Sequence, residues 1–216
     1  MGRRLADPPR SLSQAMNMGS ATEHEAAEQS PFLTELLTGQ VGRHGYAAYL
    51  VRLRSVYDAL ETAARSWRDD PLVAAVYDPA LERVGAIDTD LQYWSSGSRC
   101  EVDSPAVQRY RERLGQLSWG GAVVAHHYTR YLGDLSGGQA MATLLDREFG
   151  LDGAGLAFYQ FGFRVKPYKD SYHARLDDLG LGPKETDAVV AEVKVAFGLN
   201  QELLDELGTE LPDHRR

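Results

Sequence analysis

From Ser11 onward, hydrophobic and polar residues follow one another in the pattern of amphipathic helices almost throughout the chain. Strand signals are weak, because no alternating runs of Val, Ile and Thr are bounded by hairpin turns. The pattern therefore predicts an all-α fold. We expect helices over residues 11–28, 32–37, 43–67, 79–94, 105–117, 122–149, 166–179 and 183–207.

Proline marks the start of several of these helices. Asp78-Pro79 and Ser104-Pro105 each place a capping side chain before a proline at the first helical position, and Gly182-Pro183 begins another helix similarly. No internal repeat, long linker or domain boundary interrupts the pattern. We expect a disordered arm over residues 1–10, one compact helical bundle over 11–210 and a C-terminal tail over 211–216.

Composition narrows the class of protein. A chain of 216 residues with 43% hydrophobic and 25% charged residues suits one soluble globular domain. The 31 acidic and 23 basic residues give a net charge of −8, which argues against a general nucleic-acid binder.

Cysteine content and the termini bear on localisation. Cys100 is the single cysteine, so no intramolecular disulfide forms, and we expect it to be an ordinary residue in a reducing compartment. Arg3 and Arg4 are not followed by an apolar run, and no stretch approaches the ~20 apolar residues that span a bilayer. We expect a cytoplasmic protein with no membrane segment.

The segment over residues 125–145 is an unusual helix, because three glycines lie inside it. Each interior glycine costs roughly 1 kcal/mol relative to alanine. The simpler interpretation is close helix–helix packing on a small-x-x-x-small face formed by Gly133 and Gly137. The alternative is a kinked helix whose bare backbone lies against a flat ligand.

The charged neighbours of these glycines favour the interpretation that the helix lies against a ligand. His126, Arg130, Gly133 and Gly137 share one helical stripe, at steps of four, three and four residues, and Asp134 borders it. Arg and Asp beside such glycines are unusual for packing alone. A carboxylate beside a dry pocket can hold ordered water and relay protons.

The same segment carries a family resemblance. YTRYLGDLSGGQ, residues 128–139, resembles the distal-helix signature of haem oxygenases. HEAAE (24–28) resembles that family's proximal-histidine motif, SVYDALE (55–61) its second-helix motif and FGLN (197–200) a motif in its last long helix. The resemblance extends from about Leu12 to Leu207. It implies an all-α bundle with haem between a proximal helix and a kinked distal helix.

On the proximal side, the resemblance makes His24 the axial ligand of the haem iron. Glu28, four residues later, would accept the other imidazole N–H and fix the tautomer, or it is a solvated helix charge. Phe197 would pack against the ring.

On the distal side, the resemblance implies that Gly133 and Gly137 form a wall that lets backbone approach iron-bound dioxygen. A water network beside this wall would be held by Tyr57, Arg130, Asp134 and Asn200. Tyr57 also fits a plain core aromatic with a satisfied hydroxyl. His126 and His127 point about 100° apart, so they cannot share a metal ion, and we expect structural roles for both.

Haem carries two propionates, so basic groups should line one edge of its pocket. The resemblance points to Lys166 and Lys169, with Tyr128 donating a hydrogen bond. The chain departs from the family at two positions. Asn17 stands where a lysine is common, and His173 where many members have an arginine. Both changes weaken the expected propionate clamp.

The resemblance implies oxidative cleavage of haem, as both substrate and prosthetic group, to biliverdin, carbon monoxide and ferrous iron. Electrons must come from a ferredoxin or a flavin reductase, because the sequence shows no flavin, iron–sulfur or dinucleotide motif. We expect a monomer.

Three alternatives stand beside this function. A haem-delivery protein on the same fold would return haem intact. A di-iron carboxylate bundle requires two Glu-x-x-His motifs, and this chain has only Asp170-x-x-His173. A plain helical interaction protein would bind no haem.

Overall fold

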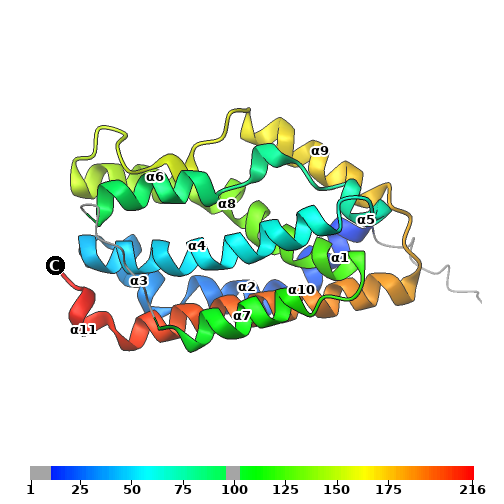
Figure 1. The fold of residues 1–216 in the computed structure, drawn as a ribbon, viewed down its shortest axis with the longest axis horizontal. Coiled ribbons are helices and arrows are strands. Elements are labelled where there is room, and N and C mark those ends of the chain that lie inside the picture. Colours follow the sequence, from blue (N-terminus) through cyan, green and yellow to red (C-terminus); the bar gives the residue numbers. More distant parts are fainter. Residues whose placement is uncertain (1–10, 96–102) are drawn as a thin grey trace, which may run out of the picture.

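The structure is a computed structural model that describes residues 11–95 and 103–216 (Figure 1). The predicted N-terminal arm and Cys100 lie outside the described residues. Within them the chain forms helices and turns with one isolated bridge, Val41 to Arg215, which confirms the all-α class. The helices are α1 (Leu12–Gly19), α2 (Ala21–Glu28), α3 (Pro31–Leu37), α4 (Arg43–Ser66), α5 (Pro71–Ala74), η1 (Pro79–Leu81), α6 (Val84–Trp94), α7 (Pro105–Gly115), α8 (Gly120–Phe149), η2 (Ala157–Tyr159), α9 (Val165–Asp177), α10 (Pro183–Thr209) and α11 (Leu211–His214).

The predicted proline starts are present. Asp78 accepts a hydrogen bond from the backbone N–H of Ala80, and Ser104 accepts one from Val107. The backbone N–H of Gly182 donates to Glu185 at 2.9 Å. These local signals place the first turns of η1, α7 and α10.

Two helices predicted as continuous are broken. The helix expected over 11–28 divides at Ser20, whose hydroxyl donates to the Met16 carbonyl at 2.8 Å. The helix expected over 79–94 divides into η1 and α6. At this second break the Arg83 side chain binds nearby backbone carbonyls, and the Glu61 carboxylate accepts the backbone N–H groups of Arg83 and Val84. The first break comes from a local serine, and the second depends on a side chain from another helix.

The long helices α4, α8 and α10 run lengthwise through the molecule, and the short helices fill the spaces around them (Figure 1). Helix α8 packs against α10 and α4, while α10 also contacts α1, α2, α3 and α7. This arrangement places α2 and α8 on two walls of one cavity. Among the described residues, no helix is both long and apolar enough to cross a membrane.

The connection between α8 and α9 is held tightly against the bundle. The buried Asp90 carboxylate accepts the backbone N–H groups of Ala157 and Phe158, both at 2.8 Å. Gln139 on α8 donates to the Tyr159 carbonyl at 2.8 Å. The sequence pattern did not predict η2, which these contacts hold against the cavity.

Residues 211–214 of the expected tail form α11. The His214 carbonyl accepts a hydrogen bond from Gly42 at 2.7 Å, and Arg215 forms an ion pair with Glu35. The end of the chain therefore contacts the start of α4 and the side of α3.

The Glu61 contacts lead to a prediction about stability. Glu61→Ala leaves two backbone N–H groups without their acceptor, so the free energy of unfolding should fall by about 3 kcal/mol. Asp88→Ala is the control, because it removes a half-exposed pair with Arg54 and should cost less than about 1 kcal/mol. Urea denaturation of both variants measures the difference. Equal losses would mean that Glu61 does not stabilise the start of α6.

Candidate active site

A cavity of about 930 Å³ lies between the walls formed by α2 and α8, with further lining from α1, α3, α4, α9, α10 and η2. This volume falls within the range of about 300–1,000 Å³ that is usual for small-molecule sites. Four residues of α2 line it, and the steps from Ala21 to His24 and from His24 to Ala27 and Glu28 are three or four residues, as one face of a helix requires; Ser20, just before α2, lines it as well.

His24 lies on the α2 wall with its side chain 53% exposed. Its Nδ1 is 3.7 Å from a Glu28 carboxylate oxygen, and its ring lies edge-on to Phe197 with centroids 5.5 Å apart. All three side chains line the cavity. The structure thus brings together the three predicted proximal residues and leaves an imidazole accessible to a ligand.

On the opposite wall, two glycines of α8 place no side chain in the cavity. A Cβ added to Gly133 or Gly137 would meet no other described atom within 4 Å beyond its own helical turn. A Cβ on Gly138 would instead lie 3.0 Å from the Tyr159 ring. Gly138 is therefore used for packing against η2, whereas Gly133 and Gly137 keep open a space that a Cβ would fill. This favours the ligand interpretation over helix–helix packing.

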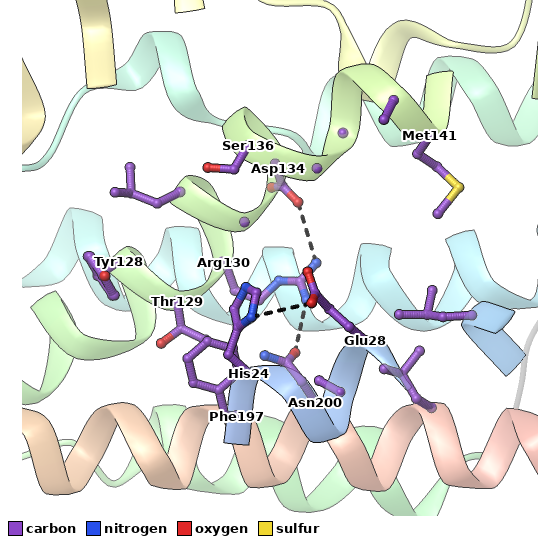
Figure 2. A pocket seen from close by; sticks show the side chains of 18 of the residues that line it. His24, Glu28, Tyr128, Thr129, Arg130, Asp134, Ser136, Met141, Phe197 and Asn200 are labelled. Carbon is purple, nitrogen blue, oxygen red and sulfur yellow. Dashed lines mark hydrogen bonds and ion pairs between the residues drawn. The ribbon is translucent and has the colours of Figure 1, made fainter. Parts of the chain in front are cut away.

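A polar network lies next to Gly133 in the sequence, at Asp134, and Figure 2 shows its members Asp134, Arg130 and Asn200. The Tyr57 hydroxyl donates to Asp134 and accepts from Arg130 Nη2 at 3.1 Å. Arg130 also donates to the Asn200 amide oxygen at 2.9 Å and lies 3.7 Å from the Asp134 carboxylate. Tyr57 is fully buried and does not line the cavity, so it binds Asp134 from the side that faces away from the cavity. The four predicted distal polar residues, from α4, α8 and α10, form one connected group.

Burial shapes the electrostatics of this group. Desolvation raises the pKa of Asp134 to about 6, against the opposing effects of the Arg130 charge and the Tyr57 hydrogen bond. Burial also raises the pKa of Tyr57 well above its usual value, so its hydroxyl remains a donor. Asp134 can therefore gain or lose a proton near neutral pH.

One edge of the cavity carries two of the predicted anion-binding residues, Tyr128 and Lys169, together with the two positions at which the chain departs from the family resemblance. Tyr128, Lys169, His173 and Asn17 line it, and Lys169 Nζ donates to Ser136 at 2.7 Å. Lys166 is an exception among the predicted residues. Its side chain is 87% exposed, pairs with Asp170 and does not line the cavity. One lysine, rather than two, therefore reaches this edge.

The adjacent histidines of α8 point to different neighbours. His126 contacts Glu192 of α10 at 2.9 Å, and His127 contacts the Tyr172 hydroxyl of α9 at 2.8 Å. Neither lines the cavity. Within residues 11–95 and 103–216, no group of three or more His, Cys, Asp or Glu side chains is placed to hold a metal ion.

Sequence reasoning missed several residues of the cavity. Tyr49 of α4 and Tyr159 of η2 line it, and Ser136 and Met141 lie on the α8 wall. Ser136 belongs to the glycine-rich motif and could have been found from its position. Tyr159 carries no local signal, because it reaches the cavity through the anchored η2 turn.

Comparison with known proteins points to one family. The family described as "Heme oxygenase" matches residues 10–206. Heme oxygenase 1 of Homo sapiens is 36% identical over 208 residues, covering 92% of this chain and 72% of that protein. Heme oxygenase 1 of the cyanobacterium Synechocystis is 34% identical, covering 91% of this chain and 84% of that protein.

Solved structures agree with the sequence comparison. Heme oxygenase from Leptospira interrogans superposes with a TM-score of 0.87 at 31% identity, over 91% of this chain and 100% of that one. Heme oxygenase-1 from Synechocystis, solved in complex with heme, gives a TM-score of 0.86 at 30% identity over 94% and 95% of the two chains.

The raised pKa of Asp134 predicts how stability depends on pH. The folded state holds the Asp134 proton more tightly than the unfolded state does, so this stabilisation is present at low pH and is lost as pH rises through about 6. Asp134→Asn lacks that dependence. Its stability relative to the native chain should therefore increase by about 2 kcal/mol between pH 4 and pH 8.

Urea denaturation of the ligand-free protein across this pH range tests the prediction. Asp69→Asn is the control, because the Asp69 side chain is 96% exposed. If the stability difference between Asp134→Asn and the native chain is the same at every pH, burial does not raise the pKa of Asp134.

Proposed function

This chain belongs to the haem oxygenase family, and on that premise we propose that its cavity binds haem and that it cleaves the ring to biliverdin, carbon monoxide and ferrous iron. One observation carries the proposal. The cavity has an accessible imidazole on one wall and two bare glycines on another, beside a buried carboxylate network. A flat ring with a metal at its centre fits this combination.

The proximal residues would bind the haem iron and orient the imidazole that ligates it. A neutral His24 nitrogen would ligate the iron, without the strong electron push that a thiolate gives. Glu28 would accept the other imidazole N–H and so fix the ring's tautomer. When bound, haem supplies both the oxygen-binding iron and the carbon ring that is consumed.

The distal residues would control protons and water. Asp134 would orient water beside the two glycines and hold or release a proton at its carboxylate oxygens, since its pKa is about 6. Arg130 and Tyr57 would hold that carboxylate in place, and Asn200 would hold Arg130. Because Gly133 and Gly137 have no side chains, they would leave space for oxygen to react beside the helix backbone. Catalysis of this kind depends on positioning more than on a side-chain nucleophile.

The edge of the cavity that carries Lys169 and Tyr128 would bind the haem propionates. Lys169 and Tyr128 would donate hydrogen bonds to these carboxylates, with His173 and Asn17 beside them. Electrons would come from a ferredoxin or a flavin reductase. We also propose that the chain works as a monomer in the cytoplasm.

The test of this function adds haem and then a reductant in air, and identifies the pigment by chromatography. The native chain should lose the Soret band and yield biliverdin, whereas a haem-delivery protein would return haem intact. His24→Ala should lose both the six-coordinate ferric spectrum and turnover, because the iron loses its ligand, and added imidazole should partly restore both. A His24→Ala variant with an unchanged spectrum and normal turnover would place the ligand elsewhere.

The anion-binding edge leads to a further prediction. A charge-assisted hydrogen bond contributes about 1.5–3 kcal/mol, so Lys169→Ala should weaken haem binding by roughly tenfold or more. Asn17→Lys should tighten binding, because it adds a cation at the cavity wall. Lys166→Ala is the control and should change little, since Lys166 lies outside the cavity. Haem titrations and biliverdin isomer ratios measure these effects, and no change in either would mean that other groups hold the propionates.

A further inference from the structure

His127 is a buried polar residue that the proposed chemistry does not use. Its side chain is 1% exposed and points to α9 rather than to the cavity. Its Nδ1 lies 2.8 Å from the Tyr172 hydroxyl, the two rings are nearly parallel at 7°, and the Tyr131 ring is 4.4 Å away. Tyr172 is itself fully buried. A specific polar contact is therefore buried between α8 and α9.

The charge state of this hydrogen bond follows from burial. Desolvation lowers the pKa of His127 to about 3 and raises the pKa of Tyr172 well above its usual value. The imidazole is thus neutral and the phenol protonated, so the contact is a hydrogen bond between two uncharged groups. The contact has a defined geometry and carries no charge.

Helix α9 presents two residues to the cavity edge. Lys169 and His173 are four residues apart on one face, and Tyr172 adjoins them. Across the described residues of α8 and α9, two side-chain hydrogen bonds join the helices. These are the exposed contact from Lys169 to Ser136 and the buried contact from Tyr172 to His127. A lysine has a flexible stem and tolerates small shifts of its helix, whereas two packed rings do not.

We propose that His127 and Tyr172 are positioning residues, which fix the register of α9 on α8 and so place Lys169 and His173 at the cavity edge. What those two residues bind rests on the proposed function. If the edge holds the haem propionates, the His127–Tyr172 pair also sets the orientation of the ring and therefore which meso carbon is oxidised.

The first test uses the ligand-free protein. Tyr172→Phe keeps the ring and removes the hydroxyl, so backbone hydrogen exchange over residues 169–176 should become several-fold faster. Tyr168→Phe is the matched control, because it removes a 2.8 Å hydrogen bond from the same helix to Asp78 instead of to α8. It should leave this stretch nearly unchanged. Equal effects of the two variants, or none, would overturn the proposal.

The second test adds haem. Tyr172→Phe and His127→Leu should each weaken haem binding about fivefold, the size expected for one hydrogen bond, and broaden the biliverdin isomer ratio. His127→Gln, whose amide can accept from the tyrosine, should restore much of the isomer ratio. A purely packing role for His127 predicts the opposite order, with leucine better tolerated than glutamine.

A double variant separates positioning from general loosening. If the pair acts through Lys169, adding Tyr172→Phe to Lys169→Ala should cause little further loss of affinity. Fully additive losses would contradict the proposal. Should the native chain bind no haem, the proposed function fails, while hydrogen exchange in the ligand-free protein still decides whether the pair fixes α9.

Discussion

The buried carboxylate of Asp134 is the constraint on which the centre of this structure depends. An ionised carboxylate away from water is strongly unfavourable unless charged or hydrogen-bonding groups surround it. Here Tyr57 of α4 and Arg130 of α8 contact the carboxylate, and Asn200 of α10 holds Arg130 in place. The three longest helices therefore meet around one polar network, and its geometry fixes their relative positions. Burial raises the pKa of Asp134 to about 6 against the lowering effects of Arg130 and Tyr57, so its carboxylate can gain or lose a proton near neutral pH.

The glycines of α8 make sense only beside this network. Each interior glycine costs roughly 1 kcal/mol relative to alanine, and no packing contact compensates at Gly133 or Gly137. At Gly138 the closeness of Tyr159 does explain the missing side chain. Of the three glycines at positions 133, 137 and 138, two thus leave a space next to the Asp134 carboxylate. This is the trade of stability for function that is expected at an active site.

Sequence reasoning succeeded where the signal was local or periodic. The proline caps and the helical stripe of Arg130, Gly133 and Gly137 depend on neighbours within a few residues, so they could be read from the chain. The break after η1 could not, because Glu61 of α4 binds the backbone of Arg83. Tyr159 was missed for the same reason, since Asp90 and Gln139 hold η2 in place. The difference between Lys166 and Lys169 follows from the rotation of α9, which its contact with α8 determines.

The charge balance makes that rotation matter. The chain carries a net charge of −8, which opposes a ligand with two carboxylates. Salt screens charges beyond about 8–10 Å, so the groups at the cavity edge decide whether such a ligand is accepted. Lys169 is held there through Ser136, and Asn17, which lines the same cavity, carries no charge. With so few cations at the edge, a small shift of α9 changes a large share of the local attraction. The neutral, buried contact between His127 and Tyr172 holds α9 without competing for the anion, because it carries no charge of its own.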